Sequence, residues 1–267
     1  MKESKVSRVL TVIVFSTLVI SAIYIVIRII MVPGGKGSGS ERLESEYILM
    51  LLQCTAGIAL MFLPGIISRK FSVTIPGKMY IIFVIFLFCA IYLGEVRNFF
   101  YQFKHWDALL HGVSGAMLGA LGFSFVTLLN DEERVPVYLS PIFVALFAFC
   151  FAIMLGVLWE FYEFIFDGLL NLNMQKYALA DGTMLVGREA LINTMKDLIV
   201  DAVGAFVVSA GGYVSLKYKT GWVDSILIKK IKSKDQTSSG QDSGKAIRSI
   251  KMQSAIRGNN SNRTVGM

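Results

Sequence analysis

Six ionisable side chains recur at helical spacing within three hydrophobic segments of this chain. They are Asp107 and His111 in the first segment, Glu160 and Glu163 in the second, and Asp197 and Asp201 in the third. Residues three or four positions apart share one face of an α-helix, so each pair forms a polar stripe. On insertion scales a charged side chain at the centre of a membrane span costs about 2.5–3.5 kcal/mol, and less near the ends. The concentration of such groups therefore predicts a functional site.

The residue types in these stripes indicate what the site could bind. Several carboxylates with one imidazole offer ligands for Mg²⁺, Mn²⁺ or Ca²⁺, and Zn²⁺ could bind through the histidine. We assign the ion ligands to His111, Glu160, Glu163 and Asp201, and expect Asp107 and Asp197 to orient them.

Two alternatives to a metal site remain open. Without a cation, mutual repulsion would keep some carboxylates protonated, and a protonated carboxyl beside a histidine is a general acid–base pair. The acidic groups could also form a purely structural network with the basic residues at the same membrane surface, which are Arg97, Lys104, Arg188 and Lys196.

The composition places the chain among integral membrane proteins. It is 54% hydrophobic and 17% charged, whereas soluble domains contain about 25% charged residues. Six apolar runs approach or exceed the length needed to cross a bilayer, and only the third is short. They cover roughly residues 9–32, 46–67, 79–94, 107–129, 141–166 and 197–216. The predicted fold class is all-α, a polytopic transmembrane helical bundle of about six spans.

The distribution of basic residues predicts the orientation of these spans. Eighteen Lys and Arg residues flank one side of the membrane and seven flank the other. An excess of these residues marks the cytoplasmic side, so we expect both termini in the cytoplasm. The start of the fourth span, the end of the fifth and the start of the sixth then lie at the external surface, as does the predicted site.

Small residues continue the polar stripes of the fourth and sixth spans. Gly115 and Gly119 follow His111, while Gly204 and Ala205 follow Asp201. Small side chains allow the backbones of neighbouring membrane helices to approach closely. If the two faces pack together, Asp201 should lie near His111.

Outside the bundle, the chain divides into segments of different composition. We expect an N-terminal transmembrane helix over 1–32, an external Gly/Ser-rich linker over 33–46, a five-span membrane domain over 47–216 and a basic, largely disordered cytoplasmic tail over 217–267. An apolar stripe over residues 222–231 predicts a short helix lying on the membrane surface. The basic charge of the tail suits anionic lipid, and without interleaved aromatic residues no nucleic-acid partner is expected.

Three ordered motifs carry a resemblance to a known family. They are Trp106-Asp107-Ala108-Leu109-Leu110-His111, Trp159-Glu160-Phe161-Tyr162-Glu163, and the run from Thr194 to Ala205 with its Asp197 and Asp201. Over roughly residues 79–216 the chain resembles the YjdF-type family of uncharacterised bacterial membrane proteins and, more distantly, VanZ-like proteins. The resemblance implies a multi-pass protein of the bacterial cytoplasmic (inner) membrane with a link to the cell envelope. Asn193 stands where this pattern has an Asp.

Together these observations favour a bacterial envelope protein whose external carboxylate/His site binds a divalent cation. Through that ion it would bind a phosphate-bearing lipid or lipid-linked envelope precursor. An ion or proton-coupled transporter and a non-catalytic membrane scaffold are the alternatives. Neither a reaction nor an oligomeric state follows from the sequence, which holds no defensible Ser/His/Asp or Cys/His arrangement.

Overall fold

The structure is a computed structural model that describes residues 5–31, 44–130, 139–179, 182–221 and 227–230. The chain divides into two compact units, Met1–Lys229 and Lys230–Met267, and all of the long helices belong to the first. Its elements are α1 (Lys5–Met31), α2 (Glu44–Lys70), β1 (Val73–Thr74), α3 (Gly77–Leu87), the π-helix η1 (Phe88–Val96), α4 (Phe99–Gln102), α5 (Trp106–Asn130), α6 (Pro141–Leu170) and α7 (Arg188–Tyr218). The short strand β2 (Lys229–Lys230) begins at the last residue of the unit.

Six helices of the described chain are long and apolar enough to cross a membrane. They correspond to the six predicted spans, so the all-α polytopic fold class is confirmed. The third span is longer than expected because η1 continues α3 without a break, and together they cover 20 residues, Gly77–Val96.

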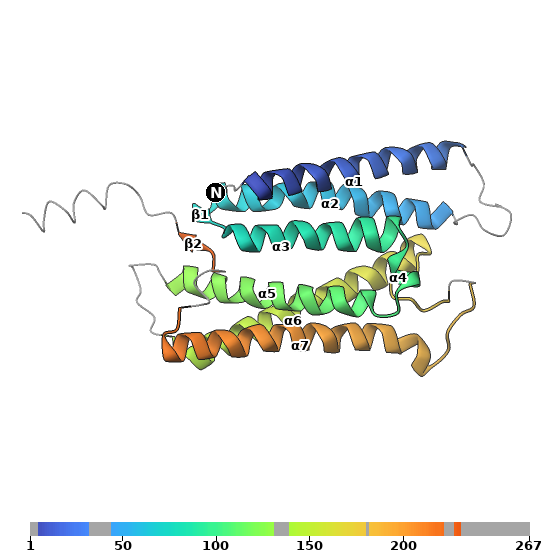
Figure 1. Ribbon diagram of the computed structural model, residues 1–267. Coiled ribbons are helices and arrows are strands. Elements are labelled where there is room, and N and C mark those ends of the chain that lie inside the picture. The colour runs from blue at the N-terminus through green and yellow to red at the C-terminus, as the bar shows by residue number, and fades with distance from the viewer. Residues whose placement is uncertain (1–4, 32–43, 131–138, 180–181, 222–226, 231–267) are drawn as a thin grey trace, which may run out of the picture. The chain divides into compact units, whose positions relative to one another are not determined.

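The long helices form two groups (Figure 1). Helices α1, α2 and α3 share a core that includes Leu18, Cys54 and Val84. Helices α5, α6 and α7 pack against one another around a second core that includes Phe123 and Ala148. The residues that could perform chemistry lie in the second group, at the α5, α6 and α7 positions predicted from the sequence.

Close backbone packing joins α5 to α7, as the small-residue faces predicted. A Cβ atom at Gly115 would lie 2.3 Å from the backbone oxygen of Asp201, and one at Gly204 would lie 2.2 Å from the backbone oxygen of Gly112. Only glycine permits these approaches. The first of them brings the Asp201 backbone directly against α5.

Local signals fix the ends of α6 and α7. Ser140 caps α6, since its Oγ accepts a hydrogen bond from the backbone N–H of Phe143 at 3.3 Å, and Pro141 occupies the first turn. Asn171 ends α6 in the left-handed conformation, with φ of 52°. Gly187 precedes α7 with φ of 63° and ψ of −127°, a conformation that favours glycine.

The segment expected to form a surface helix over 222–231 behaves differently where it is described. Leu227 and Ile228 are buried in the protein, and the next two residues are strand β2. Leu227 joins the core around Phe123, and the Ile228 N–H donates to Ser124 Oγ at 3.1 Å. Because both side chains are buried within the protein, they are not available to lie on the membrane surface. Most of the predicted linker and basic tail lies outside the described residues, and their boundaries stay predictions.

Candidate functional site

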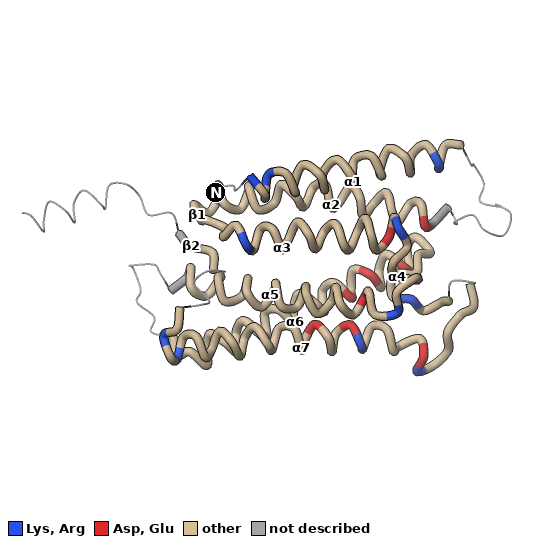
Figure 2. Tube along the Cα trace, in the orientation of Figure 1, with Lys and Arg blue, Asp and Glu red and all other residues tan. Residues whose placement is uncertain are grey.

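The ionisable stripes of three helices meet at one end of the helix group. Figure 2 shows the acidic positions of α5, α6 and α7 gathered toward the same end. Five of the predicted site residues are buried, and Asp107 is partly exposed at the start of α5; the buried ones are His111, Glu160, Glu163, Asp197 and Asp201. The helix ends thus converge as the predicted topology requires.

His111 is held by Asp201, as the small-residue faces of α5 and α7 predicted. The Nδ1 atom of His111 lies 3.2 Å from Asp201 Oδ2, with the carboxylate as acceptor. The Ser114 hydroxyl donates to the other oxygen, Oδ1, at 2.8 Å. On α6, a Cβ at Gly156 would lie 2.9 Å from Asp201 Oδ2, so the glycine makes room for this carboxylate. With Nδ1 engaged, Nε2 is the nitrogen left to bind something else.

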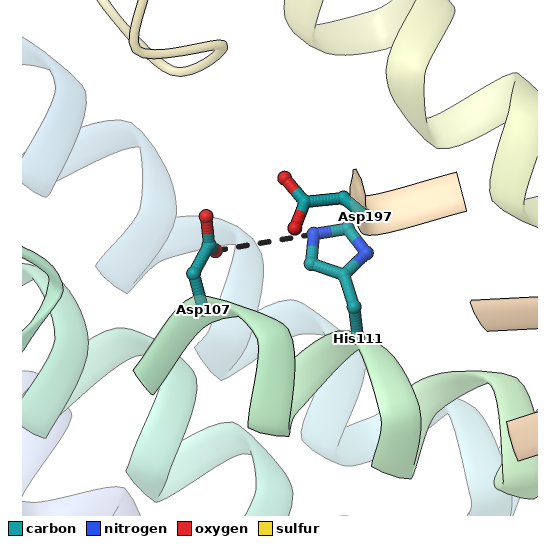
Figure 3. Close-up of side chains that lie close together, drawn as sticks. All are labelled: Asp107, His111 and Asp197. Atoms are coloured by element: carbon teal, nitrogen blue, oxygen red, sulfur yellow. Dashed lines mark ion pairs between the residues drawn. The ribbon is translucent and has the colours of Figure 1, made fainter. Parts of the chain in front are cut away.

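Nε2 faces two further carboxylates. It lies 3.9 Å from Asp107 Oδ1, one turn earlier on α5. Three possible ligand atoms, one from each of Asp107, His111 and Asp197, lie within 4.8 Å of one another. Figure 3 shows the three side chains converging. We call these three residues the ligand cluster. Its spacing suits one metal ion held between an imidazole and two carboxylates.

Each carboxylate of the ligand cluster has a second partner. Asp107 Oδ2 forms an ion pair with the Lys176 ammonium, which also lies 4.8 Å from the centre of the Phe100 ring. Asn193 Nδ2 donates to Asp197 Oδ2 at 2.6 Å. These contacts fix the orientation of both carboxylates while each retains a second oxygen.

Glu160 and Glu163 differ in how their oxygens are satisfied. Glu163 Oε1 accepts a hydrogen bond from Trp159 Nε1 at 2.9 Å, one turn earlier on α6. Glu160 is only 4% exposed, and its Oε2 accepts a long hydrogen bond of 3.4 Å from Gln175 Nε2. Glu160 Oε1 is buried and has no hydrogen-bond partner among the described residues. A buried carboxylate oxygen of this kind is free to accept a hydrogen bond from a ligand or a water.

The loop between α6 and α7 is held by side-chain hydrogen bonds and carries Gln175 and Lys176, which contact Glu160 and Asp107. Asp167 accepts hydrogen bonds from the backbone N–H groups of Met174 and Gln175, at 2.8 and 3.0 Å. Asn173 exchanges two hydrogen bonds with the backbone of Ala178. Lys176 itself has φ of 50°, an uncommon conformation for a residue with a side chain. The loop therefore holds the lysine in place over Asp107.

The structure brings all six predicted residues to one site, and the contacts among them differ from those that we expected. We expected Asp107 and Asp197 to orient the ligands, and instead they stand in the ligand cluster with His111. Asp201 supports the histidine, and Glu163 is engaged by Trp159. Neither change tests whether an ion binds.

The structural alternative named four basic residues as partners for the acidic groups. In the described part of the chain, no ion pair joins the site to Arg97, Lys104, Arg188 or Lys196. Among the described residues, the lysine that forms an ion pair with the site is Lys176, through Asp107.

The sequence did not predict the site contacts of four supporting side chains: Ser114, Gln175, Lys176 and Asn193. Two of them carried a local signal. Ser114 follows His111 by three residues, and Asn193 precedes Asp197 by four, so each shares a helical face with a site residue. Lys176 is 69 residues from Asp107, and nothing in the sequence pairs them.

An imidazole and two carboxylates around one point can hold a divalent ion and leave coordination positions open. Catalytic zinc sites commonly use three protein ligands and one water, and Mg²⁺ retains several waters while binding through one or two carboxylates. The chemistry available at the ligand cluster is therefore the binding of an ion together with an external oxygen ligand.

Comparison with known proteins places this chain in a family. The family model described as "Predicted membrane protein (DUF2238)" matches residues 6–218, which include all six candidate spans except the first residue of α1. No curated protein and no solved structure matches the chain. The protein belongs to DUF2238, a family of predicted membrane proteins of unknown function.

Proposed function

We propose that the ligand cluster binds a divalent cation and, through it, the phosphate of a lipid or a lipid-linked envelope precursor. The observation that carries the proposal is the convergence of Asp107, His111 and Asp197 within 4.8 Å of one another. Mg²⁺, Mn²⁺, Ca²⁺ and Zn²⁺ are all compatible with a ligand set of this kind.

The partner of His111 supports an ion on its other nitrogen. Histidine ligands of metal ions almost always use their second ring nitrogen to bind a carboxylate, a carbonyl or water, which fixes the ring orientation. Asp201 engages Nδ1 at 3.2 Å, and Ser114 in turn engages Asp201. This arrangement leaves Nε2 directed at the carboxylates of the ligand cluster.

Glu160 supports the proposal independently of the ligand cluster. Its Oε1 atom is buried without a partner among the described residues, although Glu160 lies near enough to His111, Asp201 and Asp107 to interact with them electrostatically. A water bound to the ion would supply the missing hydrogen bond. The same contact would place a carboxylate where it could activate that water, so hydrolysis is compatible with the site.

The position of the site supports a lipid as the ligand. The ligand cluster lies at the start of two candidate spans, and Glu160 lies in a third. A phosphate at the membrane surface could fill the open positions of an ion held there. The resemblance to YjdF-type and VanZ-like proteins supports a link to the bacterial cell envelope, and the distribution of basic residues predicts that the site lies at the external surface.

The described helices favour a binding site over a transport pathway. Beyond the ligand cluster and Asp201, the buried polar residues in the described parts of α5 and α7 are serines, namely Ser124, Ser209 and Ser215. A proton or ion pathway through this helix group would need further ionisable groups along it. A scaffold acting through the basic tail would instead depend on residues outside the described part of the chain.

Ion-dependent lipid binding tests the proposal. Detergent-purified protein is stripped with a chelator and incubated with fluorescent phosphatidic acid, with and without Mn²⁺. We expect binding that requires the ion, is lost in His111→Ala and is retained in His105→Ala, which removes the exposed histidine of the loop before α5. Equal binding with and without the ion would contradict the proposal.

A further inference from the structure

Lys176 places a positive charge beside the ligand cluster. Its ammonium donates to Asp107 Oδ2 in an ion pair and also interacts electrostatically with Asp197. Among the described residues, Asp107 is the only hydrogen-bond acceptor that the ammonium contacts. A lysine ammonium carries three N–H donors, so two of them remain for another acceptor.

The lysine lies at the partly exposed edge of a site that is otherwise buried. The side chains of Lys176 and Asp107 are 22% and 19% exposed, whereas His111 and Asp197 are buried. A ligand that enters the site from this edge therefore meets the ammonium before it reaches the histidine.

Packing of the loop between α6 and α7 holds the ammonium in this position. Leu172 and Met174 are buried and pack with Leu49 of α2. The ring of Phe100 lies 4.8 Å from Lys176 Nζ, a distance at which an aromatic face attracts a cation. An ordinary surface ion pair must instead order two mobile side chains and contributes little. The ammonium of Lys176 is therefore a preorganised charge.

An ion at the ligand cluster and the lysine would share one carboxylate. Lys176 contacts Asp107 Oδ2, and the other oxygen, Oδ1, is the one that lies 3.9 Å from His111 Nε2. An ion held by Oδ1 would therefore lie next to the ammonium without displacing it. Two neighbouring positive charges repel each other, and an anion bound between them removes that cost. The oxygens of one phosphate would reach both.

We propose that Lys176 binds the phosphate of the ligand directly, beside the ion, and selects a phosphate that has no positive charge next to it. The inference rests on the proposed function and adds to it a residue and a class of ligand. Lysine binds phosphate as a point charge, so an ammonium group in the ligand's own headgroup would repel it. The ligand is therefore an anionic lipid phosphate rather than a zwitterionic phospholipid such as phosphatidylcholine.

A matched pair of variants tests the lysine. Lys176→Gln removes its charge, and Lys104→Gln removes the charge of an exposed lysine in the loop before α5. Each protein is purified in detergent and checked by thermal unfolding. Equilibrium dialysis measures Mn²⁺ binding, and competition against fluorescent phosphatidic acid compares unlabelled phosphatidic acid, phosphatidylcholine and glycerol phosphate. Phosphatidic acid should compete at lower concentration than glycerol phosphate, which distinguishes a lipid headgroup from a free phosphate.

We expect Lys176→Gln to separate ion binding from phosphate binding. It should bind Mn²⁺ at least as tightly as the wild type, because a neighbouring positive charge is removed. It should bind phosphatidic acid and glycerol phosphate about 10–100-fold more weakly, the usual effect of losing a hydrogen bond to a charged group. Lys176→Arg keeps the charge and should retain most of the affinity, and Lys104→Gln should match the wild type.

A lysine that only neutralises Asp107 would give a different result. Lys176→Gln would then bind both phosphates as tightly as the wild type, which would overturn the proposal. Weaker binding of phosphatidic acid alone would also overturn it, because the lysine would then contact a part of the lipid other than its phosphate. So would phosphatidylcholine that competes as well as phosphatidic acid for the wild type.

Chemical labelling of the wild type gives a second readout that needs no variant. An acetylating reagent modifies accessible lysines, and mass spectrometry follows each of them. Phosphatidic acid with Mn²⁺ should slow the acetylation of Lys176, whereas Mn²⁺ alone should not, and Lys104 is the internal control. Acetylation of Lys176 that saturating lipid leaves unchanged would contradict a direct contact.

The two proposals fail in different ways. A wild-type protein that binds no ion would overturn the proposed function, whatever Lys176 does. Ion-dependent binding of phosphatidic acid that is equally tight in the wild type and in Lys176→Gln would overturn the role of the lysine alone.

Discussion

At the scale of single residues, the account depends on how His111 is oriented. Asp201 of α7 holds Nδ1, Ser114 of α5 donates to Asp201, and Gly156 of α6 makes room for its carboxylate. These three residues, one from each helix, determine where Nε2 points. In the proposed ion site, a buried carboxylate at this position would support a ligand without being one. Its contribution should therefore appear as a graded loss of affinity.

Asp201→Asn should weaken ion binding without abolishing it. The amide keeps the size of the carboxylate but loses its charge, and supporting partners of metal ligands typically contribute 10–100-fold, so a drop of about that size is expected. Equilibrium dialysis with Mn²⁺ measures it. Glu189→Gln, an exposed carboxylate in the first turn of α7, is the control and should leave affinity unchanged. An unchanged affinity in Asp201→Asn would show that the His111 contact is not part of an ion site.

At the scale of helices, close packing of α5 against α7 sets the geometry of the site. Gly115 approaches the backbone of Asp201 itself, so any side chain there must push α7 away from the histidine. The helix faces that pack and the faces that carry the ionisable groups are the same. Stability and ion binding should therefore change together when this contact is altered.

Gly115→Ala should destabilise the protein by about 1–3 kcal/mol, the usual penalty for overpacking, and weaken ion binding as well. Gly168→Ala on α6 is the matched control, because a Cβ there meets nothing within 4 Å. Removing a glycine from a helix interior is favourable by about 0.5–1 kcal/mol, so the control should be neutral or slightly more stable. Thermal unfolding in detergent compares the two. Equal stability of both variants would mean that α5 and α7 do not pack as described.

Much of the helix arrangement could be predicted from the sequence, because membrane spans can be recognised by their length and hydropathy. The contact between His111 and Asp201 was also predictable, since small residues follow both on their helical faces. The extension of the third span through a π-helix was not, because its apolar residues fit an α-helix equally well. The contact of Lys176 with Asp107 arises from a loop whose path depends on side-chain hydrogen bonds that have no periodic pattern.

The division of roles among the carboxylates was also beyond the sequence. Spacing along a helix shows which residues share a face, but two carboxylates on one face can differ in what else they touch. Trp159 engages Glu163, while Glu160, three residues earlier, keeps an unpartnered oxygen. Only the packing of neighbouring elements separates them.

At the scale of the whole molecule, the six spans place both ends of the membrane-spanning region on one side of the bilayer. The distribution of basic residues predicts that this side is the cytoplasm, and the ligand cluster then lies at the outer surface. The loop between α6 and α7 should be accessible from outside the cell, and Leu179 in that loop is 51% exposed.

Labelling of intact bacteria tests this orientation. A Leu179→Cys variant in a Cys150→Ser background should react with a membrane-impermeant maleimide without cell lysis. Lys70→Cys, at the end of α2 and on the opposite side by the same prediction, should react only after lysis. The reverse pattern would place the ligand cluster in the cytoplasm and remove the basis for an envelope ligand at the outer surface.

The central claim is that Asp107, His111 and Asp197 hold one ion, and the metal content of the purified protein tests it most directly. Elemental mass spectrometry would compare the wild type with His111→Ala and Asp197→Asn, and with the controls His105→Ala and Glu189→Gln. We predict a stoichiometric divalent metal in the wild type and both controls, and its loss in both variants of the ligand cluster. A folded wild type without metal, which also fails to take up added Mn²⁺, Mg²⁺, Ca²⁺ or Zn²⁺, would contradict the account.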